Sequence, residues 1–169
     1  MYICYTDGSC LKNGQDGNSG GYGVVVTDEH HNLLFCRSKQ SINTTNNAEE
    51  MKAILYVMLR YGVKTQGWGD TEKPPVVYSD SAYCVNTLNT WMFDWARRGW
   101  LKKDGKAPEN LELIKAYYDH YQEGYRIDLL KCSGHKGILG NEIADKLATN
   151  NISEREVYDN WENYMMKSL

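Results

Sequence analysis

Residues 2–9 read Tyr-Ile-Cys-Tyr-Thr-Asp-Gly-Ser, and this stretch decides the fold class. Its first six residues alternate in the way that is typical of a strand with one buried face. We therefore expect a strand that ends on the acid Asp7. Residues 76–79, Val-Val-Tyr-Ser, are a second short apolar run, and Asp80 follows directly. Acids at the carboxyl ends of neighbouring strands point into the crevice where open α/β sheets bind ligands, although either acid alone is commonly a helix N-cap or turn residue.

The rest of the sequence predicts three further strands and six helices. Apolar and β-branched runs indicate the strands, and apolar residues at helical spacing indicate the helices. Segment 62–75 carries three glycines and a proline pair, so we expect a loop there. The predicted strands lie at 20–27, 33–41 and 125–131, and the predicted helices at 47–61, 81–89, 91–98, 109–122, 139–149 and 153–167. This order predicts an α/β fold with a five-stranded mixed sheet flanked by helices.

Length and composition favour a single domain over residues 1–169, with 150–169 as a helical extension. No apolar run reaches the ~18 residues that a membrane span needs. The N-terminus lacks the features of a signal peptide, so we expect a cytoplasmic protein. Five isolated cysteines without a CxxC pair argue against a disulfide scaffold or a zinc site and favour reduced thiols. They are Cys4, Cys10, Cys36, Cys84 and Cys132.

The charge distribution matters more than the net charge. The net charge is −3 and the pI about 5.8, which taken alone argues against a nucleic-acid partner. Five of the nineteen Lys and Arg residues, however, lie between Arg97 and Lys106. The sequence therefore predicts a basic patch inside an acidic chain.

Glu50 is a carboxylate on the face that the helix at 47–61 is expected to bury. The positions three, four and seven residues further on are all apolar. A carboxylate on such a face costs free energy unless a cation or hydrogen bonds satisfy it. Its neighbour Glu49 fits a capping box with Asn46, so we interpret Glu49 as structural and Glu50 as functional.

A glycine-rich segment with one histidine follows the last predicted strand. His135 lies in this segment, and Asp145 lies on the next helix beside apolar residues. A lone loop histidine is more often a surface residue than a catalyst, but this loop would fold over the same crevice. Converging carboxylates without thiolates select Mg²⁺ or Mn²⁺ over zinc. Two such ions roughly 3.5–4 Å apart are the usual solution for phosphodiester chemistry, so we predict a metal-dependent nuclease.

Five pieces of the sequence resemble type 1 ribonuclease H, in order and with family-like spacing over residues 2–149. The pieces are Asp7-Gly8-Ser9-Cys10, Thr45-Asn46-Asn47 with Glu50, Asp80-Ser81, Gly134-His135, and Asn141-Glu142 with Asp145. The resemblance implies a ribonuclease-H-like fold, with helices on both faces of the sheet. It also implies cleavage of the RNA strand of RNA–DNA hybrids with two Mg²⁺ ions, for which Mn²⁺ can substitute, leaving 5′-phosphate and 3′-hydroxyl ends. Carried over by position, the metal ligands are Asp7, Glu50, Asp80 and Asp145, and His135 moves a proton as the product leaves.

The resemblance also implies a substrate-binding surface for the hybrid. Residues 91–103 resemble the basic protrusion with which cellular members grip the DNA strand, where cations neutralise phosphates and aromatic faces pack on sugars or bases. Its implied contacts are Trp95, Arg97, Arg98, Trp100, Lys102 and Lys103, with Trp91 partly in packing. The minor-groove positions are Asn13, Asn46 and Asn47, and the DNA-phosphate positions are Thr45 and Asn110.

The sequence departs from the family pattern in a few places. Ala82 replaces a common Gln and Asn43 a common Arg, while Asp94 and Asp104 dilute the charge of the protrusion. Three alternatives stay open: another nuclease or recombinase of the same superfamily, a non-catalytic hybrid-binding module, and a domain of a reverse transcriptase. The histidine loop and the protrusion argue against the first, all four acids against the second, and Met1 directly before the first strand against the third. We expect a monomer.

Overall fold

A five-stranded mixed sheet organises the chain, for which a computed structural model describes residues 1–65, 72–132 and 139–167. The strand order is β3-β2-β1-β5-β7, in which β1, β2 and β3 pair antiparallel and β1, β5 and β7 pair parallel. The bounds are β1 Ile3–Leu11, β2 Ser19–Thr27, β3 Leu33–Ile42, β5 Val76–Ser79 and β7 Asp128–Lys131. The predicted mixed sheet is confirmed.

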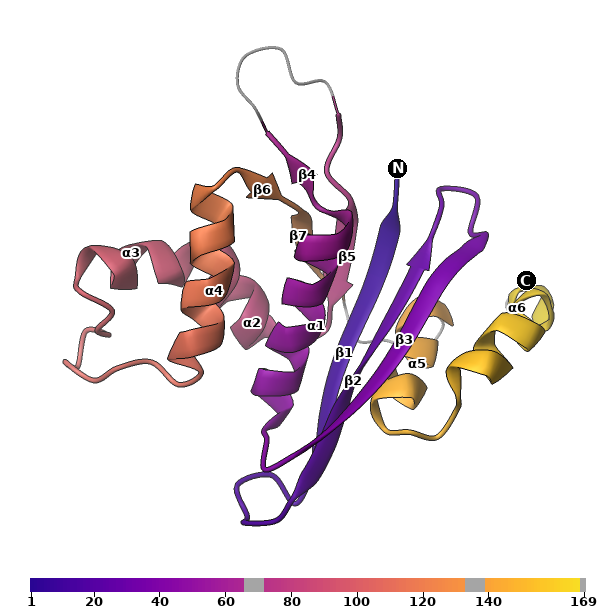
Figure 1. Cartoon of the computed structure of the whole chain (residues 1–169), viewed down its shortest axis with the longest axis horizontal. Coiled ribbons are helices and arrows are strands. Elements are labelled where there is room, and N and C mark those ends of the chain that lie inside the picture. Colours follow the sequence, from indigo (N-terminus) through magenta and orange to yellow (C-terminus); the bar gives the residue numbers. More distant parts are fainter. Residues whose placement is uncertain (66–71, 133–138, 168–169) are drawn as a thin grey trace.

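Helices cover both faces of this sheet (Figure 1). Helices α1 (Asn46–Tyr61) and α4 (Leu111–Gln122) lie on one side, and α5 (Leu139–Ala148) and α6 (Glu154–Lys167) lie on the other. Each side has its own apolar core, since both sheet faces must be kept from water. None of the helices in the described ranges is long and apolar enough to cross a membrane.

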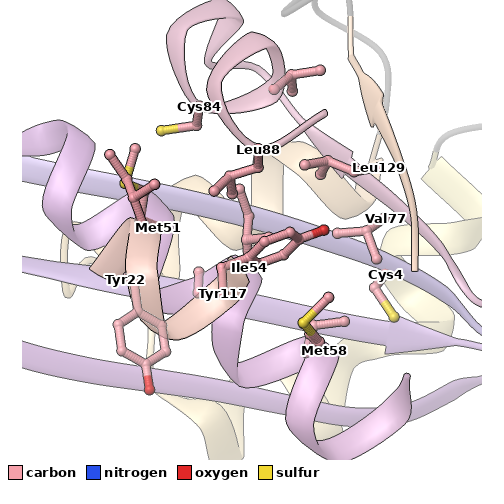
Figure 2. Close-up of a cluster of buried hydrophobic side chains, with 14 of the residues drawn as sticks. Cys4, Tyr22, Met51, Ile54, Met58, Val77, Cys84, Leu88, Tyr117 and Leu129 are labelled. Carbon is pink, nitrogen blue, oxygen red and sulfur yellow. The ribbon is translucent and has the colours of Figure 1, made fainter. Parts of the chain in front are cut away.

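The larger core lies between the sheet and α1. Figure 2 shows Ile54 and Met58 of α1 gathered with Val77 of β5 and Leu129 of β7. These are positions that the helical and strand patterns mark as apolar, so the sequence pattern and the packing agree. The smaller core joins α5 and α6 to the other sheet face; its buried members include Val25, Cys36, Ile143, Leu147 and Trp161.

Asp7 does not end the first strand, contrary to the prediction. Strand β1 continues to Leu11 because β2 pairs with it along its whole length, as far as Leu11 opposite Ser19. The parallel pairing of β1 with β5 stops earlier, at Thr6 opposite Ser79. Asp7 therefore lies where β1 and β5 separate, and Asp80 directly follows the same point on β5.

The loop predicted over 62–75 and the single strand predicted over 125–131 are both corrected. Strand β4 (Val63–Lys64) pairs antiparallel with β6 (Tyr125–Arg126) outside the main sheet. The predicted strand is therefore divided between β6 and β7. A two-residue ladder has no periodicity that a sequence can reveal.

The two helices predicted between residues 81 and 98 are one continuous helical segment. It consists of α2 (Ala82–Asn86), the π-helical turn η1 (Thr87–Trp91) and α3 (Met92–Arg97). Within it the Met92 N–H donates to the Thr87 carbonyl, which closes a wide turn with one extra residue. The extra residue shifts the apolar spacing, and this explains why the pattern alone suggested a break near residue 90.

Helix α6 attaches to the edge strand β3 through side chains. The Cys36 N–H donates to the Tyr158 hydroxyl at 2.9 Å, and the Ser38 N–H donates to Glu154 Oε1 at 2.8 Å. The Trp161 indole N–H donates to the His31 carbonyl at 2.9 Å. The helical extension is thus bound to the sheet by polar as well as apolar contacts.

Candidate active site

Three carboxylates from separate elements meet at the point where β1 and β5 part. Asp7 comes from β1, Glu50 from α1, and Asp80 follows β5, and one carboxylate oxygen of each lies within 4.8 Å of the others. Asp7 and Glu50 are 5% and 2% exposed, whereas Asp80 is exposed. The cluster therefore has a buried base and an open rim.

Gly8 allows α1 to bring Glu50 this close to β1. A Cβ at position 8 would lie 2.2 Å from the Glu50 backbone nitrogen and 2.7 Å from the Glu49 carbonyl carbon. No side chain fits in that space, so the strand and the helix approach only because residue 8 is glycine. The Asp-Gly-Ser sequence thus supplies both an acid and the close packing beside it.

Two hydroxyl groups orient the Glu50 carboxylate. Thr6 Oγ1 donates to Glu50 Oε1 at 2.8 Å, and Ser79 Oγ donates to the same oxygen at 2.6 Å. The other oxygen, Oε2, is buried and has no hydrogen-bond partner in the described ranges. A buried carboxylate oxygen without a partner is costly, and a cation bound at the cluster would satisfy it.

The pKa values of the cluster reflect the same need for positive charge. Burial raises the pKa of Asp7 to about 10, helped by a side-chain hydrogen bond with Asp145 and by the charges of Glu50 and Asp80. Burial also raises the pKa of Glu50 to about 7, although the hydrogen bonds from Ser79 and Thr6 oppose the shift. Hard divalent cations prefer carboxylate oxygens, so the donor set fits Mg²⁺ or Mn²⁺.

Asp145 reaches the rim of this cluster from α5. Asp145 is exposed, and its carboxyl group lies close enough to Asp7 to help raise the pKa of that acid. The structure therefore brings together all four of the predicted acids: Asp7, Glu50, Asp80 and Asp145. His135 lies outside the described residues.

Glu49 is held away from the cluster by partners that differ from those predicted. It is fully buried, accepts a hydrogen bond from Thr44 Oγ1 at 3.0 Å and pairs with Lys52 Nζ at 2.6 Å. The N-cap of α1 is Thr45, which accepts from the Ala48 N–H at 3.0 Å, so the capping box with Asn46 is wrong. The structural interpretation of Glu49 stays, on the basis of an ion pair whose carboxylate is buried and whose lysine is half-buried.

The predicted minor-groove residues come from the β1–β2 loop, which carries Asn13, and from the first turn of α1, which carries Asn46 and Asn47. Asn13 Oδ1 accepts from the Asn46 N–H at 3.2 Å, and both residues are exposed. Asn43, which stands where many members have Arg, accepts from the Gly17 N–H at 2.8 Å and adopts a left-handed backbone, with φ 51°. Asn tolerates this conformation well, so the departure has a local structural role.

The basic protrusion consists of α3 and the residues after it, and part of its positive charge is neutralised. Arg98 pairs with Asp94 at 3.3 Å and Lys102 lies 3.8 Å from Asp104, which are the two acids flagged as diluting its charge. Arg97 and Lys103 are exposed and form no ion pair with any residue in the described ranges. These two cations are therefore the freest to meet phosphates.

The tryptophans of the protrusion differ from the prediction in which of them are buried and which are exposed. Trp95 is only 8% exposed and packs in the larger core, so its burial argues against a substrate contact. Trp91 is 41% exposed, with its ring 6.2 Å from that of Trp95. Trp100 is half-buried against Tyr118, and its role stays a prediction.

Asn110 precedes α4 in a left-handed conformation, with φ 60°, and its side chain does not cap the helix. Its amide is thus not committed to the helix N-terminus. Thr45, by contrast, uses its hydroxyl oxygen as an acceptor for α1 and keeps its proton as a donor. The predicted roles of both residues at a DNA phosphate stay predictions.

Sequence reasoning missed Thr6 and Ser79, which orient Glu50. A signal was present, because each is a hydroxyl residue that immediately precedes a predicted metal ligand, Asp7 or Asp80. Adjacent strand residues point to opposite faces, so the strand pattern gives no reason to link these hydroxyls with the acid site. Glu50 connects the hydroxyls to the acids, because it extends from α1 and lies close to both groups. This arrangement depends on the tertiary packing of α1 on the sheet.

Known proteins match this chain over most of its length. The family model described as RNase H matches residues 1–153. A ribonuclease H of Haemophilus influenzae is 33% identical over 147 residues, which are 85% of this chain and 84% of the relative.

Two solved structures agree. LC9-RNase H1, a type 1 enzyme with the type 2 active-site motif, is 31% identical, with a TM-score of 0.65 over 88% of this chain and 70% of its own. LC11-RNase H1, in complex with RNA/DNA hybrid, is 27% identical, with a TM-score of 0.59 over 89% and 95% of the two chains. Together with the acidic cluster, these matches lead to one conclusion: the chain belongs to the ribonuclease H family.

Proposed function

We propose that this protein hydrolyses the RNA strand of RNA–DNA hybrids with two Mg²⁺ ions, leaving 5′-phosphate and 3′-hydroxyl ends. The observation that carries the proposal is the acidic cluster of Asp7, Glu50 and Asp80, built from three elements at the open end of the β1–β5 pair. The hybrid bound to the relative LC11-RNase H1 supports the choice of substrate.

Four acids would hold the ions: Asp7, Glu50, Asp80 and Asp145. When bound, the ions supply an activated water and neutralise the charge that develops on the phosphodiester. The chain positions its ligands through Thr6 and Ser79, which fix one oxygen of Glu50 and leave the other free. Mn²⁺ is expected to substitute, because it accepts the same oxygen donors.

We further propose that His135 moves a proton at the departing product. Histidine suits this role because an imidazole side chain can accept and release a proton near neutral pH. Asn13, Asn46 and Asn47 would read the minor groove, where 2′-hydroxyls distinguish RNA from DNA. The protrusion would grip the DNA strand, with Arg97 and Lys103 as its main phosphate contacts.

A cleavage assay tests the proposal directly. Labelled hybrid, double-stranded RNA and double-stranded DNA are incubated with Mg²⁺ and, separately, with a chelator. We expect cleavage of the RNA in the hybrid alone, and none with chelator. Comparable cleavage of double-stranded DNA would instead favour another nuclease of the superfamily, and binding of the hybrid without cleavage would favour a non-catalytic module.

Two adjacent glutamates provide a matched pair of variants. Glu50→Gln removes the charge of a cluster acid, and we expect it to abolish cleavage while hybrid binding survives. Glu49→Gln removes an equal charge one residue away, from the ion pair with Lys52, and we expect it to cut normally but to lose about 1–3 kcal/mol of stability. An inactive Glu49→Gln beside an active Glu50→Gln would contradict the assignment.

The physical state of the protein is a separate part of the proposal. We propose that residues 150–169 belong to the same domain as residues 1–149 and that the protein acts as a monomer in the cytoplasm. The tertiary hydrogen bonds between α6 and the sheet region support the first point.

A further inference from the structure

Asn18 joins two loops that carry or lead into the proposed groove-reading residues, and the proposed mechanism gives it no role. The first loop, residues 12–18, joins β1 to β2 and carries Asn13. The second, residues 43–45, joins β3 to α1 and leads into Asn46 and Asn47. Asn18 is a polar side chain, yet it is only 5% exposed at the base of the first loop.

The Asn18 amide grips the backbone of Thr44 with two hydrogen bonds. Its Nδ2 donates to the Thr44 carbonyl at 3.0 Å, and its Oδ1 accepts from the Thr44 N–H at 2.8 Å. The Asn18 carbonyl also accepts from the Asn43 N–H at 2.9 Å. The pairing of β2 with β3 stops at Ser19 opposite Ile42. Asn18 continues the hydrogen-bonded ladder just beyond that pair.

Thr44 is fixed from its other side as well. It is 8% exposed, and its hydroxyl donates to the buried Glu49, which in turn pairs with Lys52. The backbone of Thr44 therefore cannot shift without breaking contacts to Asn18 and to α1. This rigid residue directly precedes Thr45, the N-cap of α1 and the first proposed contact in the second loop.

Further hydrogen bonds join the outer parts of the two loops. The Gly17 N–H donates to Asn43 Oδ1 at 2.8 Å, and the Asn46 N–H donates to Asn13 Oδ1 at 3.2 Å. Both of these bonds are exposed, so water competes with them. The buried bonds of Asn18 are the ones that hold the loops together when the outer contacts open.

The backbone of the first loop indicates why the buried hydrogen bonds of Asn18 matter. Three of its residues, Lys12, Gly14 and Gly17, have left-handed backbones, with φ of 56°, 85° and 73°. A glycine-containing loop has many conformations when free, and ordering it at the moment of binding reduces affinity. Hydrogen bonds that order the loop before the substrate binds remove that cost.

We infer that Asn18 is a positioning residue for hybrid recognition. By fixing Thr44 it sets Asn13 against Asn46, so that one rigid surface made of the first loop and the start of α1 meets the minor groove of the substrate. The inference rests on the proposed function, because it concerns how the hybrid is read. It also separates recognition from chemistry, since Asn18 touches none of the four acids.

Asn18→Ala tests the inference through affinity and turnover measured separately. We expect the hybrid Kd, with Ca²⁺ in place of Mg²⁺ to suppress cutting, to rise by about 5- to 30-fold. KM should rise with it, while kcat at saturating hybrid stays within about two-fold, because Asn18 contacts none of the four acids. Asn89→Ala is the matched control: it removes an amide bond from Nδ2 to the Leu129 carbonyl, 2.9 Å long, outside both loops. We expect the control to keep wild-type Kd and KM.

A double-mutant cycle distinguishes positioning from general stabilisation. If Asn18 acts by placing Asn46, then Asn18→Ala should weaken binding less in an Asn46→Ala background than in the wild type. If Asn18 only stabilises the fold, the fold-changes in Kd of the two single variants should multiply in the double variant. The rise in Kd should then follow the loss in Tm, and the same relation should hold for Asn89→Ala. If Asn18→Ala does not fold, Asn18→Ser replaces it in the cycle, with the same expected direction and a smaller size.

The outcomes separate the inference from the proposed function. A wild-type protein that neither binds nor cuts the hybrid would overturn both. A wild-type protein that cuts the hybrid, beside a folded Asn18 variant with the Kd and KM of the Asn89→Ala control, would overturn the positioning role alone. Multiplying factors in the cycle would overturn it as well.

Discussion

Asp7 combines deep burial with proximity to three other acids. Its pKa of about 10 in the metal-free protein compares with an ordinary value of 3.8. Between these two pH values the folded chain keeps a proton that the unfolded chain has released. The free energy of unfolding should therefore fall as pH rises through this window, and it should recover when a cation takes the place of the proton.

Asp7→Asn should accordingly stabilise the metal-free protein while it abolishes cleavage. The neutral amide has no proton to lose, so we expect a gain of roughly 1–3 kcal/mol at pH 8 and a flatter pH dependence than in wild type. The measurement is urea unfolding in chelator at pH 5, 7 and 9. Asp128→Asn, a change at an exposed acid on β7, serves as control and should leave the pH dependence unchanged. Equal slopes for Asp7→Asn and wild type would refute the expectation.

Much of the site could be predicted at the level of single residues, and the exceptions have physical causes. The meeting of Asp7 and Asp80 follows from parallel pairing, and Glu50 was marked by its place on a buried helix face. The N-cap of α1 was misassigned because Thr45 and Asn46 are both good caps and stand side by side. In the structure Thr45 caps the helix, and the Asn46 N–H donates to the side chain of Asn13 from a distant loop.

The protrusion carries four basic residues, two of which pair with acids of the same region. We expect replacement of Arg97, Arg98, Lys102 and Lys103 by Ala to weaken binding to hybrids of any sequence, because phosphate contacts position the substrate without reading bases. Each lost phosphate contact should make the log–log salt dependence of hybrid affinity shallower by about 0.7–0.9. The measurement is Kd from about 50 to 200 mM salt, with Ca²⁺ replacing Mg²⁺.

The ion pairs predict an order within this set. Arg97 and Lys103 should account for most of the change in slope, since Asp94 and Asp104 already partner the other two cations. As the opposite change, Asp94→Asn together with Asp104→Asn should tighten binding. An unchanged slope in the quadruple variant would mean that the basic run is only a solvated surface.

At the level of elements, the sequence predicted long and regular pieces better than short or irregular ones. Helices α1, α4, α5 and α6 lie within two residues of their predicted bounds, because each shows several turns of apolar spacing. The π turn η1 and the β4–β6 ladder were missed. The extra residue of η1 shifts the apolar spacing, so that the pattern suggested two helices, and the two-residue strands of the ladder are too short to show a periodicity.

The whole molecule depends on two cores, and α6 closes the smaller one. Trp161 is 6% exposed there, and its indole N–H donates to the His31 carbonyl. We expect Trp161→Ala to cost about 3–5 kcal/mol of stability, the usual range for a buried aromatic residue. Met166→Ala, at a residue of the same helix that is 72% exposed, is the control and should cost little. Urea unfolding measures both, and equal stabilities would contradict a shared domain.

The position of α6 on β3 also affects how two copies of the chain can meet. Strand β3 is ten residues long and lies at an open edge of the sheet, where unpaired backbone groups can recruit a strand from another molecule. Tyr158 and Glu154 occupy two of those backbone groups, the N–H groups of Cys36 and Ser38. Loss of α6 would free both and would uncover apolar surface beside them. Helix α6 thus protects the edge strand against edge-to-edge polymerisation. A chain that lacks α6 should form sheet-rich aggregates.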